Sequence, residues 1–367
     1  MRFLSIFAPR LLAACALVAF TISAGAVEAP ARWPSPQDKD KKEAKAPPKA
    51  EQELADQIDK APDAAAKFVV AEQFVKKFPK SQIRPKVVEH LAVQAFSPPD
   101  VPQKIALAER LISLFPEAGE SALVAPFLVD AYIAAQRFDD AFRAGGAWLG
   151  KSPNDVRVLT VLSFHSVNLA QRGNSKFVAQ GQPYGPKAIE LLEAGTKPAD
   201  MTAELFKEFK DSWLPQLYQT QGLLSLVSGK TDEAFAKLQK AVGLNPSDPI
   251  THYLLGTARN EEYTKLATQI KTMSAAAQKT EMTKVNALLD EIIDHYAHTV
   301  ALAEGVKEHE QLRAQVLQDM TSYYKFRHNG STDGMQQLID KYKKPAAAPA
   351  TPAPAATPAA TPAAPPR

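Results

Sequence analysis

The sequence has almost no cysteine, few aromatic residues and little net charge. Its 367 residues include one cysteine, 8% aromatic residues and a formal net charge of +3. The cysteine, Cys15, lies in an N-terminal segment that we expect to be removed, which would leave the mature chain without any. This excludes a disulfide framework, a thiolate metal site and a cysteine nucleophile. A chain without cysteine also suits an oxidising compartment.

The small net charge argues against a general attraction to nucleic acid. The excess of positive charge lies near the ends of the chain, because residues 51–344 contain 34 Lys or Arg and 36 Asp or Glu. A near-neutral surface gains little from counterion release on a phosphate backbone. We therefore expect no nucleic-acid partner.

Strand-like alternation of apolar and polar residues is also missing, and glycine is scarce at 16 residues. Alanine is abundant, and apolar residues make up 45% of the chain. This composition favours close-packed helices. The length fits two average domains or one long repeat array.

Residues 1–26 are typical of a secretory signal peptide. Arg2 and Arg10 give it a positive start, and the apolar run at 11–22 is shorter than the ~20 residues that a membrane span needs. Small residues at 24–26 form a cleavage site, so we expect export to the periplasm or beyond the cell. Two alternatives stay open: an uncleaved anchor, or a lipid on Cys15, since residues 12–15 (LAAC) match a bacterial lipobox. Either would give envelope association.

Two further segments are predicted to lie outside the folded body. Residues 27–50 combine proline, lysine and acid and bury too little apolar surface to fold, so they read as a disordered tether. Residues 345–367 contain 11 Ala, 8 Pro and 3 Thr. Such a tail favours extended polyproline II and acts as a spacer. The predicted helical domain therefore covers residues 51–344.

Internal similarity is clearest in residues 215–248. Gly229 marks a turn between two helices, and residues 231–233 (Thr-Asp-Glu) predict the cap of the second helix. The remaining pattern consists of one aromatic residue, several small or apolar residues and a closing proline: Tyr218, Gly222, Ala234, Leu238, Ala241 and Pro246. It resembles the 34-residue tetratricopeptide repeat of exported bacterial proteins, with departures at Gln221 and Ser225.

Other units are in phase with this one. They span residues 122–155, residues 156–200 with an insertion at 172–187, and residues 249–280. Residues 71–81 and 108–118 resemble each other as helix ends. A last amphipathic helix is predicted near the end of the domain, with apolar positions at Met335, Leu338, Ile339 and Tyr342. The resemblance implies an all-α solenoid of stacked antiparallel helix pairs, closed by this C-terminal capping helix.

The resemblance also implies a binding surface. In this family four positions of each first helix face a concave groove, and they carry amide, hydroxyl and apolar side chains here. From two units we predict that a protein or peptide partner contacts Gln216, Gln219, Tyr253, Thr257 and Asn260. The corresponding residues of the unit that begins at 156 are Arg157, Thr160, Phe164 and Val167.

No catalytic motif is complete. Residues 228–231 read SGKT, but a phosphate-binding loop needs glycine five residues before its GK pair, where Leu224 stands. His295 and His298 share a helix face, yet no third metal ligand is evident, and pairing with Glu291 and Asp294 explains them. We predict a non-enzymatic binding scaffold without cofactor or metal. The partner's identity and the oligomeric state stay open.

Overall fold

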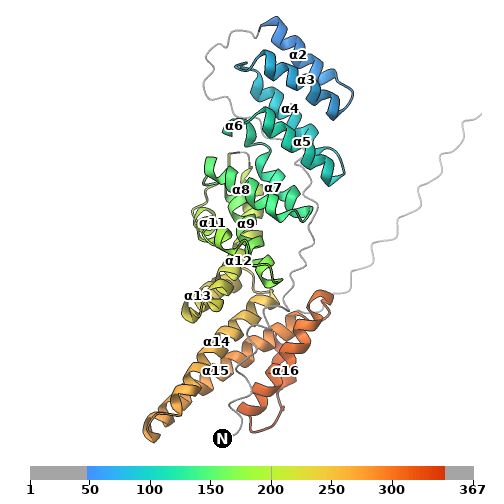
Figure 1. The fold of residues 1–367 in the computed structure, drawn as a ribbon. Coiled ribbons are helices and arrows are strands. Elements are labelled where there is room, and N and C mark those ends of the chain that lie inside the picture. Colours follow the sequence, from blue (N-terminus) through green and yellow to red (C-terminus); the bar gives the residue numbers. More distant parts are fainter. Residues whose placement is uncertain (1–47, 200, 344–367) are drawn as a thin grey trace, which may run out of the picture.

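A computed structural model describes residues 48–199 and 201–343, and this part of the chain consists of helices and connecting turns without any strand (Figure 1). The predicted signal peptide, nearly all of the predicted tether and the predicted tail lie outside these residues. Lys49 and Ala50, the last two residues of the predicted tether, are helical. Among the described residues, no helix is long and apolar enough to cross a membrane.

The helices follow one another in a regular order. They are α2 (Lys49–Lys60), α3 (Ala64–Lys77), α4 (Arg84–Phe96), α5 (Val101–Leu114), α6 (Ala118–Ser121), α7 (Ala125–Ala134), α8 (Phe138–Lys151), α9 (Val156–Gln171), α10 (Val178–Gly181), α11 (Tyr184–Glu193), α12 (Ala203–Val227), α13 (Thr231–Leu244), α14 (Pro249–Ile270), α15 (Ala275–Leu302), the 3-10 helix η1 (Lys307–His309), α16 (Glu310–Arg327) and α17 (Met335–Lys341).

Consecutive helices pair into hairpins that stack in sequence order. The pairs are α2 with α3, α4 with α5, α7 with α8, α9 with α11, α12 with α13 and α14 with α15, and each packs on the next along an elongated stack (Figure 1). Two buried apolar clusters fill this stack and adjoin at α9, α12 and α13. The predicted all-α solenoid of stacked antiparallel helix pairs is therefore confirmed.

Four second helices end in the same backbone geometry. Their last turns close at Phe78, Phe115, Ser152 and Asn245, with φ between −128° and −135° and ψ between 63° and 84°. Proline follows each of these residues, and it both lacks an N–H and excludes α geometry from the residue before it. The similarity between residues 71–81 and 108–118 is therefore one repeated helix end.

Glycine sets the distance between paired helices at one predicted position. A Cβ added to Gly222 of α12 would lie 2.7 Å from Leu238 Cγ of α13, far inside van der Waals contact. Gly256 of α14 meets the ring of Tyr296 in the same way. The small residue of the repeat pattern thus lets the two helices of a hairpin approach closely.

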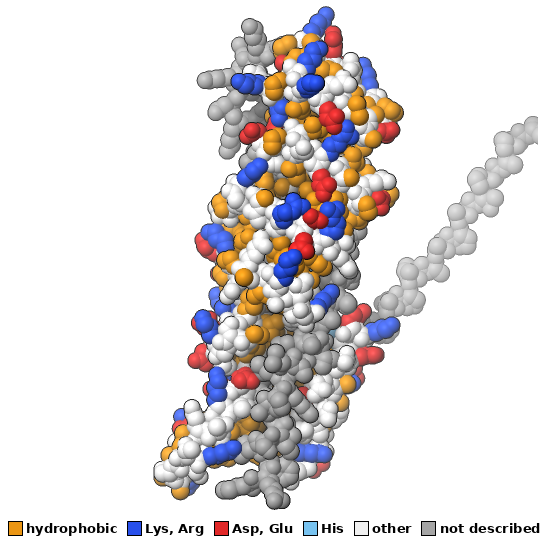
Figure 2. Space-filling view, in the orientation of Figure 1, with side chains coloured by type: hydrophobic (Ala, Val, Ile, Leu, Met, Phe, Trp, Pro, Cys, Tyr) orange, Lys and Arg blue, Asp and Glu red, His pale blue; other side chains and the backbone are white. Residues whose placement is uncertain are grey.

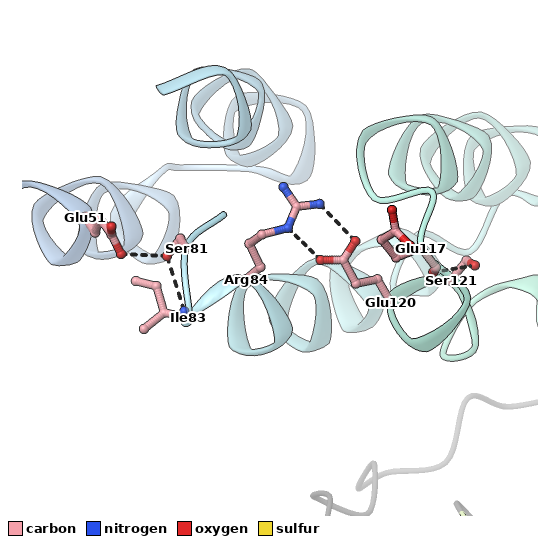
Figure 3. A network of polar contacts seen from close by, with 7 residues as sticks. All are labelled: Glu51, Ser81, Ile83, Arg84, Glu117, Glu120 and Ser121. Carbon is pink, nitrogen blue, oxygen red and sulfur yellow. Dashed lines mark hydrogen bonds and ion pairs between the residues drawn. The ribbon is translucent and has the colours of Figure 1, made fainter. Parts of the chain in front are cut away.

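Polar contacts hold neighbouring hairpins together at the first end of the stack (Figure 3). Arg84, the first residue of α4, donates from Nε and Nη2 to the two carboxylate oxygens of Glu120 in α6, at 2.7 and 2.9 Å. Ser81 donates to Glu51 of α2 at 2.6 Å and accepts the backbone N–H of Ile83. The Arg84–Glu120 pair is bidentate and largely shielded from water, which makes it stronger than an ordinary surface pair.

One three-residue joint occurs twice between hairpins. Tyr132 of α7 donates to Glu109 of α5 at 2.5 Å, and the Arg137 guanidinium lies 4.7 Å from the tyrosine ring. The second joint consists of Tyr218 of α12, which donates to Glu193 of α11, and Lys240 of α13, 5.1 Å from the ring. In both, a tyrosine on a first helix donates to a glutamate of the preceding second helix.

Several predicted boundaries were wrong. Pro215 does not open a helix, because α12 begins twelve residues earlier, where Thr202 accepts the N–H of Leu205. Residues 231–233 do not supply a side-chain cap: Lys230 is the N-cap residue, and the Thr231 hydroxyl accepts from Lys265 instead. The second helix of the unit at 156–200 begins at Tyr184, inside the predicted insertion. The helix from Pro249 ends at Ile270, before a turn capped by Ser274.

The C-terminal end of the stack is closed as predicted. Asn329 and Gly330 have positive φ angles of 52° and 92° and end the helix α16. Gly334, with φ of 85°, precedes α17, in which Ile339 is 2% exposed. Met335, Leu338 and Tyr342 pack against the same cluster. The helix α17 therefore covers the apolar end of the array.

A matched pair of glycine substitutions tests this packing. We expect Gly222→Ala to destabilise the protein by about 1–3 kcal/mol, because the added methyl group overlaps Leu238. Gly243→Ala in α13 adds a methyl group where no atom lies within 4 Å, and it should stabilise by about 0.5–1 kcal/mol. Urea unfolding measures both; equal effects would contradict the assigned contact.

Candidate functional site

The candidate site is the surface that the first helices α9, α12 and α14 share. These helices pack side by side in sequence order. We call the twelve residues at the four groove positions of these helices the inner wall: Arg157, Thr160, Phe164, Val167, Gln216, Gln219, Leu223, Leu226, Ile250, Tyr253, Thr257 and Asn260.

Gln219 joins two repeats. Its side chain is 4% exposed, and its amide donates to Asp248 and, at 2.7 Å, to the Thr251 hydroxyl. Asp248 caps the start of α14 by accepting the backbone N–H groups of Ile250 and Thr251, each at 3.1 Å. Gln219 is therefore bonded to the capped end of the next first helix.

The other predicted residues also have partners within the stack. Tyr253 stacks on Tyr296 of α15 with ring centroids 6.1 Å apart, and the Thr257 hydroxyl donates to the Tyr253 carbonyl at 2.9 Å. The most C-terminal of the five, Asn260, accepts the hydroxyl of Tyr323 from α16 at 2.6 Å.

Gln216 is half-buried and donates to the Ser212 carbonyl of its own helix at 3.2 Å. Its Oε1 is buried without a hydrogen bond. Of the five predicted residues, Gln219, Tyr253 and Thr257 are buried, and Gln216 and Asn260 are partly exposed. Contact of these five with a partner stays a prediction.

Sequence reasoning missed an aromatic series along the first helices. The ring of Phe96 in α4 lies 5.6 Å from that of Phe127 in α7, and the ring of Phe164 in α9 lies 5.5 Å from that of Trp213 in α12. Between these pairs, the Arg157 guanidinium lies 5.8 Å from the Phe127 ring. We call the four rings the aromatic track. Phe164 was among the predicted groove positions, but the repeat pattern did not include the other three rings, and their recurrence on successive first helices was an unused signal in the sequence.

Asp130 of α7 lies beside this track and was also missed. Burial raises its pKa to about 7, although nearby Arg157 acts in the opposite direction. Its side chain is only partly exposed. A carboxyl group in this setting favours a cationic or hydrogen-bond donor partner.

The histidines form a stack instead of a metal site. The rings of His252 and His298 are parallel with centroids 4.3 Å apart, and Tyr342 covers the other face of His298 at 3.4 Å. The ring of His295 lies 6.0 Å from His252. No cluster of three or more His, Cys, Asp or Glu in the described part of the chain is arranged to hold a metal ion.

Only one of the two predicted histidine pairs is present. His298 Nδ1 lies 3.6 Å from the Asp294 carboxylate. Glu291 instead pairs with Arg259 of α14 at 2.5 Å. The predicted pair of Glu291 and His295 is not among the ion pairs of the described residues. The stack therefore joins α14, α15 and the residue that follows α17.

The SGKT segment forms a repeat turn. Gly229 has a positive φ of 72° and closes α12, and Lys230 pairs with Glu233 at 3.3 Å. Asp232 and Glu262 line the same shallow hollow, together with Lys265. Carboxylates on both sides of this hollow disfavour a phosphate group.

Comparison with known proteins gives no family. No protein-family model and no curated protein sequence matches this chain. Two similar solved structures are a monomeric mutant of IFIT1 with Gppp-AAAA (14% identity, TM-score 0.34) and the human IFIT1 dimer with m7Gppp-AAAA (12% identity, TM-score 0.34). The matches cover 77% and 76% of this chain but only 56% and 55% of those chains. At this low structural similarity, the capped ligands describe those complexes and are not transferred to this chain.

The two glutamines of α12 allow a matched test of the inner wall. We expect Gln219→Ala to destabilise by about 1–3 kcal/mol, because Asp248 and Thr251 lose a buried donor. Gln216→Ala removes one bond within the helix and should change stability by no more than about 0.5 kcal/mol. Chemical denaturation compares them, and a Gln219→Ala variant as stable as Gln216→Ala would refute the joint.

The histidine stack predicts loss of stability in mild acid. Burial is the main cause that lowers the pKa of His252, His295 and His298, and it lowers the pKa of His295 to about 4. The nearby carboxylates of Asp248 and Asp294 act to raise these pKa values, and the cations Arg259 and Lys341 act to lower them. Folded pKa values below the usual 6.5 mean that the stability from the neutral rings is present above pH 6.5. It is lost as the pH falls toward about 4.

Thermal unfolding of the wild type and of His295→Gln, measured from pH 7 to pH 4, tests this. The variant cannot take up the proton, so its unfolding temperature should fall less steeply with pH. His309→Gln in η1, outside the stack, serves as control. Parallel curves for the wild type and His295→Gln would contradict the assignment.

Proposed function

We propose that this chain is an exported, non-enzymatic scaffold of tetratricopeptide type that binds a protein or peptide partner along the inner wall. The observation that supports this most directly is the order of the stack. The first helices α9, α12 and α14 pack side by side, so their groove positions make one continuous surface instead of three separate ones.

The chemistry of the inner wall fits an extended peptide. The amide side chains of Gln216 and Asn260 are partly exposed. Apolar side chains such as Leu223 lie between these polar groups. A partner's main chain would bond to the exposed parts of these amide groups, and its apolar side chains would lie against the wall.

Charge supports a protein partner over nucleic acid. On the face shown in Figure 2, basic and acidic side chains are interspersed along the stack, and no broad patch of one sign covers it. Many belong to pairs, such as Lys176 with Asp139 and Arg137 with Asp140. A surface of this kind offers little steering toward a polyanion.

Export is part of the proposal and rests on residues 1–26. The alternative is a membrane-tethered factor of cell-envelope assembly, favoured by the lipobox match at residues 12–15. The two differ in the first residue of the mature protein, which is Val27 in the soluble scaffold and acylated Cys15 in the tethered one.

Crosslinking and recovery of the partner from the native envelope test the binding surface. We expect the double variant Arg157→Ala/Gln216→Ala to recover at least tenfold less partner than the wild type, because two central contacts of about 1 kcal/mol each are lost. These residues are preferred to Gln219, whose loss would weaken the stack itself.

The matched control is Arg143→Ala/Gln239→Ala, which removes the same residue types from the exposed surfaces of α8 and α13. It should recover the partner like the wild type. Equal recovery with both double variants would place the binding surface elsewhere on the molecule.

A further inference from the structure

The buried core of the stack is divided inside α12, which lies near the middle of the array (Figure 1). This helix contributes to the first apolar cluster as far as Tyr218 and to the second from Leu223 onward. The other buried members of the first cluster precede α12 in the chain and those of the second follow it, with Ala241 and Val167 as the two exceptions. The described part of the chain therefore has two apolar bodies that meet within one helix.

Buried polar side chains are concentrated at this division. Of the fifteen buried polar or charged residues in the described part of the chain, eight lie in α9 and α12, so this is a local feature and not a property of every helix pair. Residues 219–222 of α12 are Gln-Thr-Gln-Gly, between the apolar residues of the two clusters. We call six of the eight buried residues the polar layer: Thr160, Ser163, Ser166, Thr220, Gln221 and Ser225.

The polar layer does little to hold α9 and α12 together. Ser166 donates to the Ser163 carbonyl at 2.7 Å and Thr220 to the Leu217 carbonyl at 2.9 Å, each within its own helix. Three groups of the layer are buried without a hydrogen bond in the described structure: Thr160 Oγ1, Ser163 Oγ and Gln221 Nε2. Buried polar groups without bonds oppose the arrangement that buries them, and they regain bonds when water reaches them. The contact at the division is therefore weaker than the apolar contacts on either side of it.

The backbone of α12 is also weakened next to the polar layer. Pro215 lies inside the helix, and it has no N–H to donate to the carbonyl of Asp211 one turn earlier. Sharp bends in helices are found mostly at such positions. One turn further on, the Tyr218 hydroxyl donates to Glu193 of α11 and accepts from Lys240 of α13 at 3.1 Å. A polar contact between the two bodies thus lies beside the weakened turn.

We propose that α12 is a hinge at residues 215–222, about which the two apolar bodies bend relative to each other with the Tyr218 joint as the pivot. The first body comprises α2–α11 and the start of α12, and the second comprises the end of α12 and α13–α17. Bending admits water to the polar layer and leaves the apolar packing inside each body unchanged. Large motions of rigid bodies depend on a few residues of this kind that absorb the change in backbone angles.

The hinge gives the inner wall an adjustable curvature. Arg157 and Phe164 belong to the first body, and Tyr253 and Asn260 belong to the second. Bending changes the distance between these two sets, and a partner that contacts both sets fixes it. This consequence rests on the proposed function, whereas the bending itself is a property of the chain without a partner.

Distances between pairs of spin labels on the full chain, measured by double electron–electron resonance, test the hinge. Cys15→Ser removes the single cysteine of the sequence, and labels are then attached to cysteines introduced at exposed positions. The label pairs are Ala147→Cys/Gln318→Cys across the hinge, Lys86→Cys/Ala147→Cys within the first body and Ala236→Cys/Gln318→Cys within the second. We expect the distance distribution across the hinge to be at least about twofold broader than either of the others. Equal widths for the three pairs would overturn the proposal.

A double substitution locates the bend. Pro215→Ala restores the helix N–H, and Gln221→Leu replaces a buried unbonded amide with an apolar side chain, so together they should reduce the excess width across the hinge at least about twofold. The matched control is Pro102→Ala/Gln311→Leu, which changes an exposed proline in the first turn of α5 and an exposed glutamine of α16. It should leave the width unchanged. A broad distribution that Pro215→Ala/Gln221→Leu and Gln221→Leu alone both leave unaltered would place the bend elsewhere and refute the assignment to α12.

Failure of the hinge and failure of the proposed function give different results. Equal widths in the free chain, together with loss of the partner in Arg157→Ala/Gln216→Ala, would reject the hinge and support the binding surface. A broad distribution that responds to the α12 substitutions, together with unchanged partner recovery, would support the hinge and reject the binding surface.

Discussion

The whole structure depends on the fact that one helical hairpin cannot bury both of its faces. Burial comes from stacking, so each hairpin is stable only because the next one fits it. The fit inside a hairpin requires close approach at Gly222 and Gly256, where any larger residue would push the helices apart. The repeated end before proline then turns the chain back at the same angle each time, as at Phe78 and Phe115. The same helix-end geometry is thereby repeated in successive hairpins.

Between hairpins the structure uses polar joints as well as apolar burial. The tyrosine–carboxylate–cation joint at Tyr132 and its counterpart at Tyr218 connect first helices to the second helices before them, and Gln219 connects two first helices. Buried polar groups are costly unless they are satisfied, so such joints disfavour a shifted register more than they add stability. A side chain that already bonds within such a joint, such as Gln219, is poorly available to a binding partner. The groups suited to recognition are those the stack leaves unsatisfied.

This distinction explains what the sequence could and could not predict. Helix ends, the close approach at Gly222 and the apolar face of the capping helix depend on residues near in sequence, and all three were predictable from spacing. Pro215 misled because proline favours a helix start, whereas the first turn at Thr202 carried the cap and the helix continued through the proline. The role of Gln219 depends on Asp248, 29 residues away, and no local pattern encodes that contact. Positions in the groove were predictable, but not which of them the stack itself would use.

The two ends of the array are held by different chemistry. At the first end Arg84 and Glu120 form a bidentate pair, in which Glu120 raises the pKa of Arg84. At the last end the neutral rings of His252 and His298 pack against Tyr342, and burial lowers the pKa of both histidines. Protonation of these histidines therefore opposes packing at the capping helix. Because terminal repeats unfold independently of distant ones in a nearest-neighbour array, acid should loosen the stack from α17 inward and not as a single unit.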